Sequence, residues 1–264
     1  MRVCLLSLLM AATALAQAEI QTSEIPYTAD DGTKMIGYYA YDDAVEGKRP
    51  GVVVVHEWWG LNDYAKRRAR DLAELGYSAL AIDMYGEGKH TDHPKDAMSF
   101  MQAALADADA AKARFTAGLD LLKEQAQTDP ARLGAVGYCF GGKVVLDMAR
   151  QGVPLEGVVS FHGALATETR AVPGSVKARI LVEHGSEDSM VSASDVAELN
   201  AEMVKAGADF QFVSLPGAKH GFTNPGADEH KEKGLDLAYS KAADERSWAD
   251  MQRFLQETFE KARP

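Results

Sequence analysis

Long hydrophobic runs and basic residues are both scarce in this sequence. The apolar stretch at the N-terminus, residues 3–15, is shorter than the roughly 20 residues that a membrane-spanning helix needs. The 28 lysines and arginines are outnumbered by 39 aspartates and glutamates, and the formal charge of -11 repels nucleic acid and anionic lipid. We therefore expect a protein that, once processed at its N-terminus, binds neither nucleic acid nor membrane.

The first residues have the pattern of a secretory signal. Arg2 precedes the apolar stretch, and small residues suit cleavage after Ala16 or Ala18. We therefore predict a signal peptide over residues 1–18 and a secreted, periplasmic protein over residues 19–264. A retained membrane anchor is the alternative interpretation of the same segment.

Cysteine is rare, with two residues in the chain. Cys4 lies within the predicted signal, so the processed chain keeps Cys139 as its only thiol. No intramolecular disulfide can then form. A free thiol in an oxidising compartment is open to oxidation, so a chemical role explains Cys139 better than packing does.

Strands and helices alternate along the processed chain. Apolar runs predict strands at residues 34–41, 51–56, 78–84, 133–137, 156–161, 178–184 and 210–215. This alternation predicts an α/β protein with a mainly parallel sheet covered by helices on both faces. Because there is no internal repeat, low-complexity tract or linker, we expect residues 19–264 to form one domain, and we expect a monomer.

Helices are predicted from capping residues and apolar spacing. Asn62 can cap a helix that Gly76 ends. The alanine-rich stretch 97–125 carries a core-facing stripe, and a last helix, about 243–261, is expected to pack on the sheet. The apolar residues of these two stretches are Phe115, Leu119 and Leu122 in the first and Trp248, Met251, Leu255 and Phe259 in the second.

The segment "GYCFGG", residues 137–142, places Cys139 at a turn between a strand and a helix. Glycine two residues before it and two after it allows a sharp turn that exposes the middle side chain. A small core cysteine is the alternative. Asp188 and His220 follow two later strands, so nucleophile, acid and histidine occur in the chain order of an α/β-hydrolase triad.

Taken together, these motifs resemble the dienelactone hydrolase family, a cysteine-nucleophile branch of the α/β hydrolases. The resemblance extends from about Glu24 to the C-terminus and rests on "VVVVHEWWGLN", "AIDMYG", "GYCFGG", "HGSEDSMV" and "KHGF". It implies the α/β-hydrolase fold, a triad of Cys139, His220 and Asp188, and an additional active-site carboxylate at Glu57. It also implies hydrolysis of a small ester or lactone through a thioester intermediate, without a cofactor.

The implied roles suit the residue types. His220 can take the thiol proton and return it to the leaving oxygen, while Asp188 fixes the imidazole tautomer. The family uses the residue at Glu57 to hold the resting thiol of Cys139 and to help deprotonate it when substrate binds. A solvated carboxylate at the end of a strand is the alternative for Glu57.

Residues next to these motifs are candidates for binding the substrate. The resemblance implies an oxyanion hole made by the backbone N–H groups of Trp58 and Phe140. Trp59 and Tyr85, together with Trp58, are expected to line an apolar pocket. The "HTDH" segment, residues 90–93, lies in a predicted loop without a clear further ligand, so we expect no metal site.

The substrate assignment is where this chain departs from the family. Members that cleave dienelactones hold the substrate carboxylate with two arginines, and the matching residues here are Glu87 and Asn224. We therefore expect neutral esters or lactones with an apolar acyl part, unless Lys89 or Lys219 restores a positive charge. A thioester or acylated-sugar hydrolase is one alternative, and a non-catalytic secreted binding or thiol redox-responsive protein is another.

Overall fold

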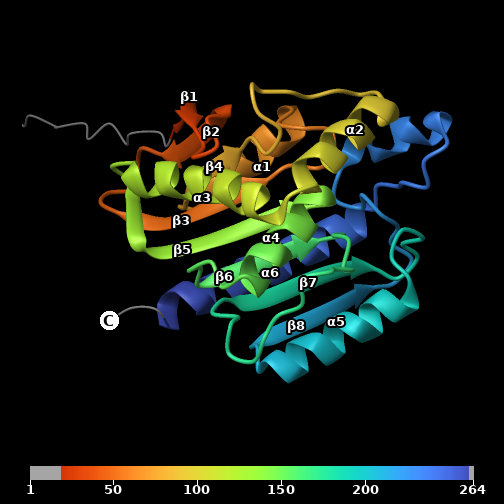
Figure 1. Cartoon of the computed structure of the whole chain (residues 1–264). Coiled ribbons are helices and arrows are strands. Elements are labelled where there is room, and N and C mark those ends of the chain that lie inside the picture. Colours follow the sequence, from red (N-terminus) through yellow and green to blue (C-terminus); the bar gives the residue numbers. More distant parts are fainter. Residues whose placement is uncertain (1–18, 262–264) are drawn as a thin grey trace, which may run out of the picture.

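The computed structural model of this chain describes residues 19–261, so the predicted signal peptide and its cleavage positions lie outside the described residues. Within them, eight strands form one sheet in the order β1-β2-β4-β3-β5-β6-β7-β8 (Figure 1). The first two strands join their neighbours antiparallel and the remaining pairs are parallel. The strands are β1 Ile20–Thr28, β2 Lys34–Asp42, β3 Arg49–Val55, β4 Ser78–Ile82, β5 Thr128–Tyr138, β6 Gly157–Phe161, β7 Arg179–Gly185 and β8 Phe210–Leu215.

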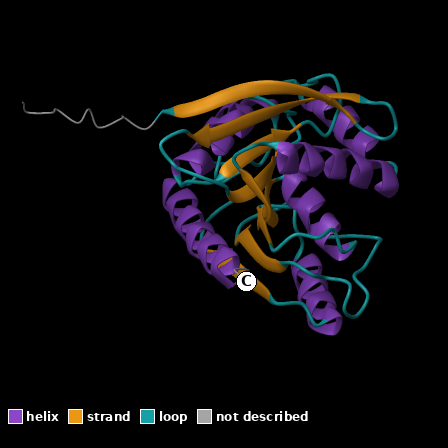
Figure 2. Ribbon diagram, turned by 90° about the vertical axis from the view of Figure 1, so that its left-hand side faces the viewer, coloured by secondary structure: helices purple, strands orange, loops and turns teal. Residues whose placement is uncertain are grey.

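Helices cover both faces of this sheet, as Figure 2 shows. α1 and α6 pack on one face, α3, α4 and α5 pack on the other, and α2 lies against α3. The predicted α/β architecture is therefore confirmed. The helices are α1 Asp63–Glu74, α2 Pro94–Leu105, α3 Ala108–Glu124, α4 Phe140–Arg150, α5 Ala193–Ala206, the 3-10 helix η1 Pro225–Lys233 and α6 Lys241–Lys261.

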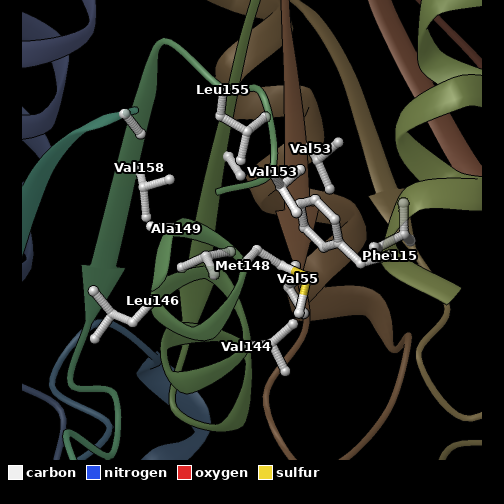
Figure 3. Packing of buried hydrophobic residues seen from close by; sticks show 14 of the residues in the cluster. Val53, Val55, Phe115, Val144, Leu146, Met148, Ala149, Val153, Leu155 and Val158 are labelled. Carbon is white, nitrogen blue, oxygen red and sulfur yellow. The ribbon is translucent and has the colours of Figure 1, made fainter. Parts of the chain in front are cut away.

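The central strand β3 is buried on both faces, because its side chains alternate between two cores. Val52 and Val54 join the core under α1 and α6. Val53 and Val55 join the opposite core, where Figure 3 shows them close to Phe115 of α3. An unbroken run of β-branched residues is typical of a strand in this position. No helix among residues 19–261 is long and apolar enough to cross a bilayer.

Two local features were not predicted from the sequence. The stretch 97–125 contains parts of two helices, because α2 ends at Leu105 and α3 begins at Ala108. Asp107 separates them, and its carboxylate accepts hydrogen bonds from the first N–H groups of α3. The edge strand β1 was not predicted. Its polar, half-exposed sequence contains Pro26, which an edge strand tolerates.

A buried carboxyl group lies in β7. Glu183 is fully buried, and neither of its carboxyl oxygens has a hydrogen-bond partner within the described residues. Burial, together with the nearby charge of Asp250, raises the pKa of Glu183 to about 8. The folded protein therefore keeps this proton at pH values at which an unfolded chain has lost it.

We expect Glu183→Gln to be more stable than the parent at alkaline pH. Between the ordinary glutamate pKa and about 8, the folded parent binds more protons than its unfolded chain, so its free energy of unfolding falls as the pH rises. The amide removes the buried charge and should add roughly 1 to 3 kcal/mol at about pH 9. Urea unfolding at about pH 5 and pH 9 measures this, with the exposed Glu187→Gln as control. Equal pH slopes for Glu183→Gln and the parent would contradict the prediction.

Candidate active site

Cys139 occupies the turn between β5 and α4, in a backbone conformation that favours glycine. Its φ is 54°, and it precedes the first residue of α4. A Cβ on Gly137 would lie 2.1 Å from the carbonyl oxygen of Gly141, and a Cβ on Gly141 would lie 2.2 Å from that of Val55. Both glycines are therefore needed for the strand and helix to meet this closely. The cysteine side chain is half-buried at the crest of the turn.

His220 and Asp188 meet at the same edge of the sheet. Nδ1 of His220 is 2.9 Å from Oδ2 of Asp188, and both side chains are buried. The other carboxylate oxygen accepts the backbone N–H of Met190, so Asp188 is held at both oxygens. This contact fixes the tautomer of His220 with its proton on Nδ1 and leaves Nε2 for chemistry.

The electrostatics of His220 connect it to Cys139. Burial alone would lower the pKa of His220, but Cys139 and Asp188 outweigh burial and raise it well above its ordinary value. The two side chains are thus neighbours, although Nε2 completes no well-aligned hydrogen bond within the described residues. Loose alignment of this kind is common in a resting site that tightens around its substrate. The pair can form an imidazolium and a thiolate.

Glu57 lies next to this pair and is buried, which excludes the solvated-carboxylate alternative. The side-chain amide of Asn224 donates a hydrogen bond of 2.6 Å to Oε2 of Glu57. Burial raises the pKa of Glu57 to about 7, against the opposing effects of Asn224, His220 and Arg68. A carboxyl group with this pKa can gain or lose a proton near neutral pH.

The four polar side chains open into one apolar cavity of about 280 Å³. Cys139, His220, Glu57 and Asn224 lie in its wall. The remaining wall is mainly aromatic and aliphatic, with Trp58, Trp59, Met98, Met101, Met190 and Leu237 among its members. Figure 1 shows α2 and the blue segment that contains η1 at the same end of the sheet, where they supply part of this wall.

The other predicted binding residues differ in their placement. The backbone N–H groups of Trp58 and Phe140 donate no hydrogen bond within residues 19–261, so both are free to bind an oxyanion. Tyr85 does not contribute to the cavity wall. Its ring is buried, and its hydroxyl donates to the carbonyl oxygen of Trp58 at 2.9 Å. Tyr85 therefore supports the wall from behind, unlike Trp58 and Trp59, which line it.

Three charged residues considered for substrate recognition lie elsewhere. Glu87 is exposed, 3.3 Å from the ammonium of Lys89, and neither contributes to the cavity. Lys219 pairs with Asp236 at 2.5 Å on the surface. The expected repulsion of a substrate carboxylate by Glu87 is therefore not supported. Of the two positions that match the family's arginines, Asn224 lines the cavity and Glu87 does not.

A buried histidine next to the nucleophile turn was missed in the sequence. His162 directly follows β6, and its Nδ1 accepts a hydrogen bond from the backbone N–H of Cys139 at 3.1 Å. Its Nε2 contacts the hydroxyl of Thr223 at 2.7 Å. Burial, with the charges of His220 and Arg68, lowers the pKa of His162 well below its ordinary value. A neutral imidazole thus bridges the nucleophile turn and the loop that carries His220. In the sequence, the signal that could have identified His162 was its position at the end of a predicted strand.

Comparisons with known proteins agree with this geometry. Protein usf of Aquifex pyrophilus is 32% identical over 199 residues, which cover 74% of this chain and 84% of that protein. A putative carboxymethylenebutenolidase of Aquifex aeolicus is 29% identical over 199 residues, which also cover 74% of this chain and 84% of that protein. The crystal structure of a dienelactone hydrolase-like promiscuous phosphotriesterase from metagenomic libraries has 38% identity and a TM-score of 0.86, covering 91% of this chain and 99% of that one. The family model named "Dienelactone hydrolase family" matches residues 35–259, and this chain belongs to that family.

Proposed function

We propose that this protein hydrolyses neutral carboxylic esters or lactones with an apolar acyl group, through a thioester on Cys139. The observation that carries the proposal is the shared cavity, in which Cys139, the His220 imidazole bound to Asp188, and buried Glu57 meet an apolar wall. A nucleophile, a general base and an apolar binding surface are the components that ester cleavage requires.

In the first half-reaction, the sulfur of Cys139 forms a bond to the carbonyl carbon, and the thiol proton passes to Nε2 of His220. The carbonyl oxygen becomes an oxyanion, for which the free N–H groups of Trp58 and Phe140 are the proposed donors. The carbon–oxygen bond then breaks. His220 gives its proton to the departing alkoxide, and the acyl group stays on sulfur as a thioester.

In the second half-reaction, water attacks the thioester carbonyl while His220 accepts one of its protons. The carbon–sulfur bond breaks, the carboxylic acid leaves, and the proton returns from His220 to the sulfur. Asp188 stabilises the imidazolium in both halves. The charge of Glu57 controls the resting thiol of Cys139. An ionised Glu57 disfavours a thiolate at Cys139, whereas a protonated Glu57 does not.

The preference for neutral substrates rests on the charges in the cavity. Asn224 is neutral, and its amide already donates to Glu57. Lys143 reaches the cavity, but its ammonium is 2.9 Å from Asp147. A substrate carboxylate therefore finds a buried acid and no unpaired cation among these residues. The loss of one charged hydrogen bond, about 1.5 to 3 kcal/mol, lowers efficiency by roughly an order of magnitude or more.

A neutral phosphotriester is a second candidate substrate. The observation in its favour is the similarity to a protein described as a promiscuous phosphotriesterase, at 38% identity over 91% of this chain. A phosphotriester carries no charge and suits an apolar cavity, and its phosphoryl oxygen would use the same N–H donors.

Export, cleavage after Ala16 or Ala18, and a monomeric state remain proposals from the sequence. The basic start, apolar stretch and small residues of the N-terminus support export to the periplasm. Intact mass and sedimentation of material recovered from the periplasm test all three.

The function is tested by rapid mixing with p-nitrophenyl butanoate, followed by a comparison of a carboxylated lactone with its methyl ester. We expect a burst of nitrophenol and at least about a tenfold preference for the methyl ester, at low and at high salt. No release of nitrophenol would favour the non-catalytic binding or redox alternative. Preference for the free carboxylate would contradict the neutral-substrate proposal, and its loss in Lys143→Met would identify the cation responsible.

A further inference from the structure

A second hollow, a groove of about 550 Å³, adjoins the catalytic cavity. Leu105 at the end of α2 and Lys143 of α4 line both spaces, so the groove and the cavity lie side by side. Its walls are α4, the junction between α2 and α3, and residues 166–169, which follow β6. A substrate that is held at Cys139 and reaches past Lys143 would enter this groove.

The face of α4 that borders the groove begins at the nucleophile. Cys139, Lys143, Asp147 and Gln151 are spaced four residues apart, and residues at this spacing form one inclined row along the surface of a helix. With a rise of 1.5 Å per residue, Lys143 lies about 6 Å and Gln151 about 18 Å along the axis from Cys139. This length suits a group attached to the ester oxygen rather than a separate ligand.

The groove differs from the cavity in chemistry, because polar groups take up much of its wall. Gln151, Thr167, Glu168 and Thr169 contribute an amide, two hydroxyls and a carboxylate. The Thr167 hydroxyl is used within its own turn, where it donates to the carbonyl of Thr169. Within the described part of the chain, the side chains of Gln151 and Thr169 make no hydrogen bond and remain available to a ligand.

The charges of the groove disfavour an anion. Lys143 donates to Asp147 at 2.9 Å and to the carbonyl of Ala166 at 3.0 Å. Arg150, behind the groove, is paired with the other oxygen of Asp147 and with buried Glu202. Both cations are therefore engaged, and exposed Glu168 adds a negative charge. A neutral group with several hydroxyls can bind such a wall as donor and acceptor.

We infer that this groove binds the alcohol part of the ester, and that this part is a neutral polyhydroxyl group such as glycerol or a sugar. The inference rests on the proposed function and narrows its substrate class. The acyl group lies in the apolar cavity, the scissile carbonyl lies at Cys139, and the hydroxylated part follows α4 past Lys143.

The test compares butanoate esters of methanol, glucose and choline in a pH-stat, using the parent, Ala166→Trp and Ala131→Trp. Ala166 lines the groove and is exposed, so a tryptophan there fills it, whereas Ala131 is exposed at the opposite end of β5. In the parent, kcat/KM for the glucose ester should exceed that for the methyl ester about tenfold, mainly through KM. Ala166→Trp should abolish this preference for the glucose ester, and Ala131→Trp should retain it.

Calorimetry with hexyl β-glucoside, a glycoside that contains no ester bond, gives a readout independent of turnover. Its Kd should rise about tenfold in Ala166→Trp and stay unchanged in Ala131→Trp. The inference would be overturned if Ala166→Trp left both the kcat/KM ratio of the glucose and methyl esters and the Kd for the glucoside unchanged. A kcat/KM for the choline ester above that for the glucose ester would also overturn it. If no ester is cleaved, the proposed function fails, while loss of glucoside binding in Ala166→Trp still supports the groove.

Discussion

Replacing Cys139 by alanine should abolish ester turnover while the protein stays folded. The sulfur forms the bond that carries the acyl group, and no second thiol lies within residues 19–261 to replace it. Loss of a covalent nucleophile costs on the order of 10⁴-fold or more in kcat. The side chain is half-buried at the crest of its turn, so its removal should cost about 1 kcal/mol or less in stability. Stopped-flow kinetics and urea unfolding of the same preparation measure the two effects.

The serine variant is the matched test of the same position. Cys139→Ser keeps the shape of the side chain but presents a hydroxyl, which is much less acidic than a thiol. His220 and Glu57 surround a residue that must lose its proton, so we expect Cys139→Ser to be nearly as inactive as alanine. Turnover at the parent level in Cys139→Ala would end the thioester mechanism.

The nucleophile turn could be predicted from the sequence because its cause is local. Gly137 and Gly141 are required by contacts with the next turn of α4 and with β3, and glycine at such positions is visible as a pattern. Asp188 and His220 could also be predicted, because each follows a strand and parallel strands end at one edge of the sheet. The fold followed from the alternation of strands and helices.

Other features depend on contacts between distant segments, and no local pattern shows them. The hydrogen bond between Glu57 and Asn224 joins residues 167 positions apart. Tyr85 lies in a motif beside the cavity, but its hydroxyl bonds to the carbonyl of Trp58 and its ring stays behind the wall. The break between α2 and α3 was not predicted, because alanine-rich sequence favours helix on both sides of Asp107.

The loop after β8 connects three parts of the site. It supplies His220, which binds Asp188, and Thr223, whose hydroxyl contacts His162 behind the nucleophile. One residue later, Asn224 holds Glu57. The imidazole, the nucleophile turn and the additional carboxylate are therefore positioned by one short segment. A substitution in this loop should therefore disturb the imidazole, the nucleophile turn and the additional carboxylate together. The role of the triad acid is best tested by substituting Asp188 itself.

Asp188→Asn should lower kcat by roughly 10²- to 10⁴-fold, the upper value being that of the matching change in serine proteases. The amide oxygen can still accept the N–H of Met190, so the turn that Asp188 caps is preserved. What is lost is the negative charge at Nδ1 of His220. This charge, together with Cys139, raises the pKa of His220 above its ordinary value despite burial. Its loss lowers that pKa and disfavours the imidazolium and thiolate pair.

The same change should therefore slow alkylation of Cys139 by iodoacetamide, because the thiolate is stabilised by the His220 imidazolium, and a lower pKa of His220 makes that imidazolium less stable. Rates of alkylation and ester turnover are compared over pH for the parent, Asp188→Asn and Asp30→Asn, an exposed aspartate between β1 and β2. Asp30→Asn should match the parent in both. Parent-like turnover and alkylation in Asp188→Asn would assign this residue to its turn alone, because the hydrogen bond to Met190 is the interaction that the amide retains.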